Sequence, residues 1–72
     1  MDNKITKIYS LGRNIFRRRK EIGLSQNDLA EILEISREHL AKIETAKRTP
    51  KISTLIDIAD ALKITVKDLI DF

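Results

Sequence analysis

Two serines that can cap helices, Ser25 and Ser36, stand eleven residues apart and constrain the fold of this chain more than any other feature. A serine oxygen at such a position accepts a hydrogen bond from a free amide in the first helical turn. Apolar residues follow each serine with the spacing of an inward helical stripe: Leu29, Ala30 and Leu33 after the first, Leu40 and Ile43 after the second. Only Glu34 and Ile35 lie between the two predicted helices. The helices must therefore turn sharply and pack together.

The second of these predicted helices has polar side chains on one side only. On a wheel of about 100° per residue, its outer face spans about 140° and comprises Arg37, Glu38, Ala41, Lys42 and Thr45. Such side chains can donate to guanine, accept from cytosine or touch a thymine methyl. An ordinary solvated helix face is the alternative interpretation. The tight turn, the small Ala30 and the basic flanks instead favour a helix-turn-helix over about residues 25–45, with its second helix in a DNA major groove.

The composition narrows the fold class and the chemistry. The 72 residues include no cysteine and one histidine, which excludes disulfides, thiolate metal sites and histidine-rich metal sites. Hydrophobic residues make up 42% of the chain but aromatics only 4%, with two glycines and one proline, which predicts an all-α fold. No apolar run is long enough to span a membrane, and no signal-peptide pattern opens the chain. We expect one cytoplasmic domain covering residues 1–72.

Charge is distributed unevenly along the sequence. Residues 1–24 hold seven basic and two acidic side chains, whereas residues 25–36 hold three acidic and no basic ones. Residues 37–51 hold five basic and two acidic side chains, and residues 52–72 hold two basic and four acidic ones. Positive charge therefore gathers in residues 1–24 and around the second helix of the predicted helix-turn-helix, which is called the recognition helix below. Such clustering is typical of proteins that bind nucleic acid.

The first helix is predicted over about residues 8–22, with residues 1–7 flexible and Gly23 as the left-handed residue after its end. Its apolar stripe contains one cation, Arg19, which needs a partner in the core. Glu44, on the inner flank of the recognition helix, is the candidate, and a role in orientation is expected. The alternative is that Arg19 extends to water or a phosphate. Of the basic run in residues 17–20, Arg17 is the one expected to reach the DNA backbone.

Two further helices complete the predicted fold. A fourth helix is expected from a cap at Ser53 to about Leu62, and a short fifth helix from a cap at Thr65 to about Ile70. Val66 and Leu69 would close the core. The prediction is a compact domain of five helices without repeats or linkers.

Four motifs in this sequence resemble the lambda-repressor/Cro-like helix-turn-helix family, also called the XRE family. They are Leu24-Ser25-Gln26-x-x-Leu29-Ala30, Ile35-Ser36-x-x-x-Leu40-x-x-Ile43-Glu44, Lys47-Arg48-x-Pro50 and Leu55-x-x-Ile58-Ala59-x-Ala61-Leu62. The resemblance covers about residues 10–70 and implies sequence-specific binding of operator DNA, usually as a two-fold dimer. It implies a transcriptional regulator, expected to be a repressor or an autoregulator, that binds a palindromic operator.

The resemblance also implies roles for particular residues. Positions that contact base edges or adjacent phosphates are matched by Ser36, Arg37, Glu38 and Lys42. Positions that contact the DNA backbone are matched by Gln26, Thr45, Lys47 and Arg48. Gln26 would also brace the recognition helix, and Arg19 with Glu44 resembles an internal ion pair of the family. Glu38 can either accept from cytosine or hold Arg37 or Lys42 in place.

Three residues depart from the family pattern, in each case where glycine is common: Glu34 in the turn, Ala46 after the recognition helix and Lys63 after the fourth helix. A left-handed conformation at Glu34 would cost about 1 kcal/mol. These departures affect the loops and leave the hydrophobic pattern intact.

A dimer surface is expected near the end of the chain. The candidates by position are Thr54, Val66, Asp68, Ile70 and Phe72. The alternative is that Ile70 and Phe72 cap the core of a monomer.

Two other function classes are alternatives to a DNA-binding regulator. A protein-interaction module with the same fold, which binds no DNA, is the main alternative. An enzyme is not expected, because one histidine, no glycine-rich phosphate loop and no paired-carboxylate cleft provide no catalytic machinery. No cofactor, metal or small-molecule ligand is expected. A phage-type repressor, a restriction–modification controller and an antitoxin-like autoregulator fit the sequence equally.

Overall fold

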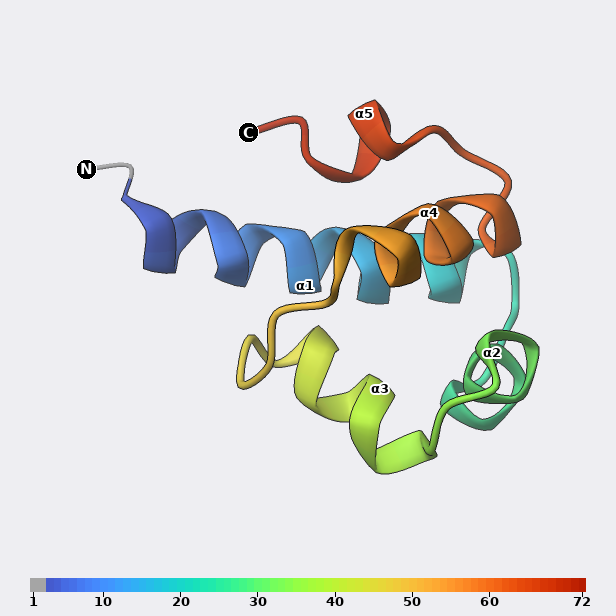
Figure 1. Cartoon of the computed structure of the whole chain (residues 1–72). Coiled ribbons are helices and arrows are strands. Elements are labelled where there is room, and N and C mark those ends of the chain that lie inside the picture. The colour runs from blue at the N-terminus through green and yellow to red at the C-terminus, as the bar shows by residue number, and fades with distance from the viewer. Residues whose placement is uncertain (1–2) are drawn as a thin grey trace.

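The computed structural model describes residues 3–72, which form five helices and no strand (Figure 1). The helices are α1 (Lys4–Glu21), α2 (Gln26–Leu33), α3 (Arg37–Glu44), α4 (Ile52–Ala61) and α5 (Val66–Leu69). Helix α1 packs against α3 on one side and α5 on the other, and α4 packs against both α2 and α5 (Figure 1). The predicted all-α, five-helix fold is confirmed.

Helix α1 begins earlier than the sequence indicated. The Asn3 side chain accepts a hydrogen bond from the Thr6 backbone N–H at 2.9 Å, so the helix starts at Lys4. The predicted start at about residue 8 is therefore wrong; the expected flexibility of residues 1–7 stays a prediction, and residues 1–2 lie outside the described part. An apolar stripe marks only turns that touch a core, and residues 4–7 are exposed. At the other end, Gly23 has the predicted left-handed conformation, with φ of 80°.

The turn between α2 and α3 is built from capping interactions. Ser25 and Asp28 form a capping box, in which each backbone N–H donates to the other side chain at 2.9 and 3.0 Å. Ser36 Oγ accepts from the His39 N–H at 2.9 Å and begins α3. Between them Glu34 is left-handed, with φ of 58° and ψ of 39°. A non-glycine residue thus makes the sharp turn, as expected.

Helix α4 does not start at the predicted cap. It begins at Ile52, preceded by an extended Lys51 that provides no side-chain hydrogen bond, and Ser53 lies exposed inside the first turn. The prediction followed the chemistry of serine, but the Leu55 N–H donates to the Lys51 carbonyl oxygen at 2.9 Å, which starts the helix directly after Lys51. Lys63 adopts a left-handed φ of 60°, and Thr65 then caps α5 as predicted, through a capping box with Asp68.

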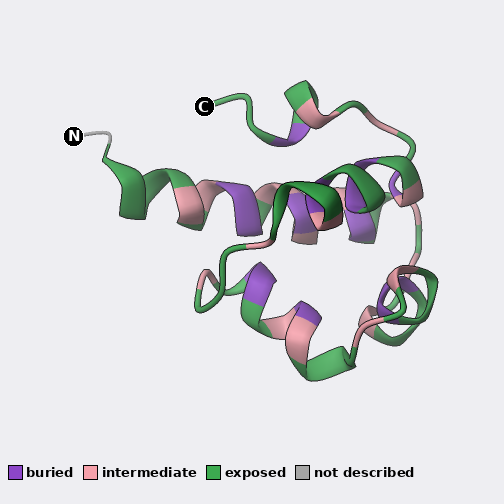
Figure 2. Cartoon of the chain, viewed as in Figure 1, coloured by how far each residue is buried: buried purple, intermediate pink, exposed green. Residues whose placement is uncertain are grey.

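One aliphatic core holds the helices together, and Figure 2 shows in purple the buried part of each helix that forms it. Its fully buried large side chains are Ile15, Leu29, Leu40, Ile43, Ile58, Leu62 and Leu69. Helix α1 approaches the end of α3 most closely at Gly12, where an added Cβ would lie 2.5 Å from the Glu44 carbonyl oxygen. This contact fixes the position of α3.

Candidate nucleic-acid interface

The C-terminal end of α3 is held by a buried ion pair. Arg19 donates from Nε to Glu44 Oε2 at 2.7 Å and from Nη2 to Glu44 Oε1 at 3.0 Å, and both residues are 5% exposed. Gln26 Nε2 adds a third hydrogen bond to Glu44 Oε1 at 3.1 Å. A two-pronged guanidinium–carboxylate contact has a narrow geometry. Helices α1, α2 and α3 are therefore locked in one relative orientation.

The guanidinium of Arg19 is satisfied on its other sides as well. Its Nη1 donates to the Leu24 carbonyl oxygen at 2.9 Å, and its Cζ lies 5.2 Å from the centre of the Phe16 ring. No buried side-chain nitrogen or oxygen in the described residues lacks a hydrogen-bond partner. Because the charge is fully paired, Arg19 is not available to water or phosphate, and its role is to orient α3.

The outer face of α3 is free. Ser36, Arg37, Glu38 and Lys42 are all exposed, and Ala41 is half-buried between them. Two ion pairs occur within residues 3–72, Arg18 with Glu21 and Arg19 with Glu44, so Glu38 does not hold Arg37 or Lys42 in the unbound protein. The Ser36 oxygen accepts from the helix, which leaves its hydroxyl proton available to a ligand.

The chain after α3 returns Lys47 to the same side. Ala46 is left-handed with φ of 64°, and the N–H groups of Lys47 and Arg48 both donate to the Lys42 carbonyl oxygen, at 2.8 and 3.2 Å. This closed turn defines the path of Lys47 and Arg48, although Ala46 stands where glycine is common in the family. Lys47 thereby lines an open hollow of about 310 Å³ together with Glu38, Ala41, Lys42 and Thr45.

Three predicted phosphate contacts have different surroundings from one another. Gln26 keeps one amide N–H after donating to Glu44, so it can brace α3 and donate to a phosphate at the same time. The Thr45 hydroxyl already donates to the Ala41 carbonyl oxygen at 2.8 Å. Arg17 contacts Asn14 Oδ1 at 3.4 Å and lines a hollow with Asp68 and Leu69, on the α5 side of α1. Arg17 is thus not brought together with the face of α3.

The five candidates for a dimer surface differ in their exposure and surroundings. Asp68 is exposed but its carboxylate accepts from the Thr65 N–H at 3.1 Å, and Val66 is half-buried against the core. Thr54 lines a different hollow, with His39 and Arg48. Ile70 and Phe72 are each 45% exposed, so they do not cap the core completely.

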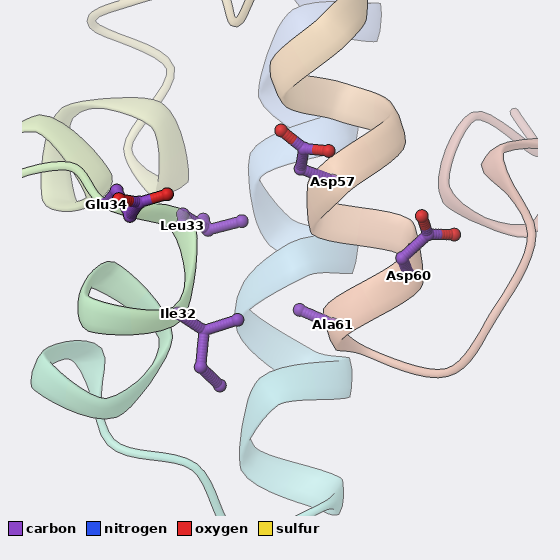
Figure 3. Close-up of a pocket in the computed structure, with 6 residues that line it drawn as sticks. All are labelled: Ile32, Leu33, Glu34, Asp57, Asp60 and Ala61. Carbon is purple, nitrogen blue, oxygen red and sulfur yellow. The ribbon is translucent and has the colours of Figure 1, made fainter.

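A second concave surface lies between α2 and α4 and carries the opposite charge. Figure 3 shows Ile32, Leu33 and Glu34 on one side and Asp57, Asp60 and Ala61 on the other, around a groove of about 410 Å³. The carboxylates of Glu34, Asp57 and Asp60 repel phosphate. This groove is therefore no part of a DNA surface.

Some contacts have no signal in the sequence. Arg18 Nε donates to the Leu62 carbonyl oxygen at 3.0 Å and ties α1 to the end of α4, although a basic run predicts solvated side chains. Gly12 could have been suspected, because glycine inside a helix is unfavourable unless another backbone approaches it.

Other kinds of site have no counterpart in the described structure. Residues 3–72 contain no group of three histidine, cysteine, aspartate or glutamate side chains placed to bind a metal ion. None of the described helices combines the length and hydrophobicity needed to cross a bilayer.

Known proteins share this arrangement. The family model described as Helix-turn-helix, HTH_3, matches residues 15–69. The immunity repressor of Bacillus phage phi105 is 41% identical over 61 residues, which are 85% of this chain and 42% of the repressor. The HTH-type transcriptional regulator y4dJ of Sinorhizobium fredii is 32% identical over 60 residues, 83% of this chain and 78% of that protein. The chain thus spans about two fifths of the phage repressor and most of the second protein.

Solved structures agree with the sequence relatives. The restriction–modification controller protein C.AhdI of Aeromonas hydrophila superposes with a TM-score of 0.84 at 25% identity, over 89% of this chain and 97% of that one. The biofilm regulator SinR, solved in complex with DNA, superposes with a TM-score of 0.76 at 33% identity, over 82% and 95%. The match of the family model, the aligned relatives and the observed α2–α3 geometry together show that this chain belongs to the helix-turn-helix family of DNA-binding transcriptional regulators typified by lambda-repressor-like repressors.

Proposed function

We propose that this protein binds a palindromic DNA operator as a homodimer, with α3 in the major groove, and acts as a repressor or autoregulator. One observation carries the proposal: the Arg19–Glu44–Gln26 contacts fix the inner side of α3, while Ser36, Arg37, Glu38 and Lys42 stay exposed on its outer side. A rigid helix with a free polar face is what reading base edges requires. A cytoplasmic location is part of the proposal, because the partner is DNA.

Distinct residues would anchor the protein and read the bases. Lys47, Arg48 and the free amide N–H of Gln26 would bind phosphates and set the register, and Arg37 or Lys42 would pair with guanine. Glu38, unpaired by other described residues, would accept from cytosine. A single α3 reads few base pairs, so two copies with recognition helices about 34 Å apart would supply the specificity.

The relatives support this assignment. An immunity repressor aligns with most of the chain, and SinR, similar over nearly its whole solved chain, is named in complex with DNA.

Selection of bound duplexes from a random pool tests the proposal. The expected product is one sequence with two-fold symmetry and half-sites about one helical turn apart. Its affinity should exceed that of a scrambled duplex and fall steeply between 50 and 200 mM salt, as phosphate contacts release counterions. A pool that yields no enriched sequence, together with no salt-dependent binding, would contradict the proposal.

A protein-interaction module is the second candidate, and the acidic groove between α2 and α4 favours it (Figure 3). In that case, replacing outer residues of α3 would leave DNA affinity unchanged, whereas Asp57→Lys with Asp60→Lys would abolish partner binding. Operator binding that survives the groove variant and fails in Arg37→Ala would reject this candidate as the main function.

A further inference from the structure

The outer face of α3 contains one apolar spot among charged side chains. The open hollow of about 310 Å³ is lined by Glu38, Ala41, Lys42, Thr45 and Lys47, and Ala41 alone among them has no polar group in its side chain. Ala41 is half-buried at the centre of this face. The hollow therefore has a methyl group on its floor and charges on its rim.

Thr45 adds a second methyl group. Its hydroxyl donates to the Ala41 carbonyl oxygen at 2.8 Å and lies 3.4 Å from the Lys42 carbonyl oxygen, so Oγ1 is turned toward the helix backbone. The Cγ2 methyl, on the other branch of Cβ, is the part of Thr45 left to line the hollow. This geometry suits an apolar contact better than the phosphate contact expected from the resemblance.

The most prominent apolar group on a base edge in the major groove is the 5-methyl group of a pyrimidine, and the nitrogen and oxygen atoms beside it are hydrogen-bond donors or acceptors. Placing one of those polar atoms against two methyl groups would leave it unpaired, at the cost of its hydration. The charged rim suits the neighbour of a thymine methyl, because Lys42 can donate to thymine O4.

We propose that the hollow between Ala41 and Thr45 receives the 5-methyl group of one pyrimidine in each half-site, which makes Ala41 and Thr45 specificity-determining residues. The inference rests on the proposed function, since it concerns the same face of α3. Thymine is the ordinary source of that methyl group, and 5-methylcytosine is the other.

Uracil substitution in the operator tests the contact directly. In the duplex selected from the random pool, each thymine is replaced in turn by deoxyuridine, which removes only the methyl group. One position per half-site should lose affinity about fourfold, the effect of burying a single methyl group. Replacing that thymine–adenine pair by a 5-methylcytosine–guanine pair identifies the source of the methyl group. Retained affinity shows that the hollow accepts the methyl group of either base. Lost affinity shows that thymine is required and that its O4 is read as well.

Matched protein variants test the two residues. Thr45→Val keeps the methyl group and removes the hydroxyl, so the thymine-to-uracil ratio should stay near fourfold. Thr45→Ser and Ala41→Gly remove one methyl group each, so the ratio should fall toward one. The ratio compares two duplexes on one protein preparation, so a partly unfolded variant does not distort it.

The failures are distinguishable. Uracil that is tolerated at every thymine of a tightly bound operator overturns the methyl contact and leaves DNA binding intact. General weakening by Thr45→Val, with thymine discrimination unchanged in Thr45→Ser, assigns Thr45 to phosphate and also overturns the inference. Absence of any preferred duplex overturns the proposed function itself.

Discussion

At the scale of single residues, Glu44 connects the stability of this protein to its surface. Its carboxylate receives hydrogen bonds from both Arg19 and Gln26 while its own helix presents the opposite face to solvent. Buried ion pairs add little net stability, but removing one partner leaves a buried charge unpaired. The pair therefore matters more for where α3 lies than for how stable the fold is.

The first prediction follows from that asymmetry. Glu44→Gln should lower the free energy of unfolding by about 3–5 kcal/mol, because the Arg19 cation remains buried without its counter-charge. Urea denaturation measures the loss. Arg19→Met combined with Glu44→Leu should recover part of it, and the exposed Glu31→Gln should change stability by less than about 0.5 kcal/mol. A Glu44→Gln protein as stable as the Glu31→Gln control would contradict the assigned role.

The second prediction separates reading from anchoring. Arg37→Ala should cost about 1–3 kcal/mol on the selected operator and little on a scrambled duplex, since a base contact is lost. Lys47→Ala should weaken both duplexes alike and reduce the salt slope by about 1, since a phosphate contact is lost. Fluorescence anisotropy titrations at two salt concentrations measure both effects. Equal losses on both duplexes for the two variants would show that the division is wrong.

At the scale of helices, α1 and α3 approach each other closely at Gly12. Gly12 lies on the face of α1 where a Cβ would meet the carbonyl oxygens of Glu44 and Ile43 at 2.5 and 2.8 Å. A side chain there cannot move aside, because the atoms it meets are backbone. The α1–α3 interface, which positions the recognition helix, thus depends on the absence of a side chain at Gly12.

Gly12→Ala should therefore cost about 1–3 kcal/mol or more, because α3 must move away from α1. Gly23→Ala is the matched control: its φ of 80° is unfavourable for alanine, but nothing lies within 4 Å of the added Cβ. That control should cost about 1 kcal/mol. Urea midpoints compare the two, and a smaller loss for Gly12→Ala than for Gly23→Ala would refute the close approach. Gly12→Ala should also weaken operator binding beyond its effect on folding.

The capping boxes of α2 and α5 make stability depend on pH. Donation from the Ser25 backbone N–H, and then the contact with the Ser25 side chain, hold the pKa of Asp28 below its usual 3.8. The Thr65 backbone and side chain lower the pKa of Asp68 in the same way. A lowered folded-state pKa contributes stability above pH 3.8 that is lost as pH falls through the lowered value.

The fourth prediction uses Asp28→Asn with Asp68→Asn. The parent protein should be more stable than this variant at pH 6, and the difference should shrink as pH falls below 3.8 toward 2, where the parent carboxylates take up protons. Urea denaturation at a series of pH values follows the difference. A gap that stays constant from pH 6 to pH 2 would contradict the capping explanation.

At the scale of the whole molecule, opposite charges are separated among different surfaces. Basic residues surround the outer face of α3 and the turn after it, whereas carboxylates line the groove between α2 and α4. Such a separation would orient the protein as it approaches DNA. The acidic groove shares no lining residue with the proposed DNA-binding face.

The fifth prediction concerns the proposed dimer. Ile70→Asp with Phe72→Asp should shift the protein toward monomer in sedimentation experiments, because both exposed side chains would lose apolar contact with a second copy. Affinity for a two-half-site operator should fall while affinity for a single half-site stays unchanged. Ile56→Asp is the control, since Ile56 is 46% exposed on α4 and Ile70 is 45% exposed. Dimers that persist in the double variant would place the interface elsewhere.

The sequence alone determined the features that depend on local chemistry and on periodicity. Apolar spacing identified the helices and their inward faces, serine and threonine caps located the starts of α2, α3 and α5, and the unpaired cation in the first stripe pointed to Glu44. Each of these follows from interactions between residues a few positions apart, or from a rule on buried charge. The helix-turn-helix and its exposed polar face were predicted on that basis.

Only the tertiary structure decided features that depend on how distant segments approach one another. The hydrogen bond from Arg18 to the Leu62 carbonyl oxygen, 44 residues away in sequence, depends on how α1 packs against the end of α4. The placement of Arg17 beside α5 and the close approach of Gly12 to the Glu44 carbonyl oxygen likewise came from helix packing. The hollow at Ala41 is built within residues 38–47, where Thr45 turns its hydroxyl inward and the left-handed Ala46 turns Lys47 back, but this irregular geometry leaves no periodic trace in a sequence.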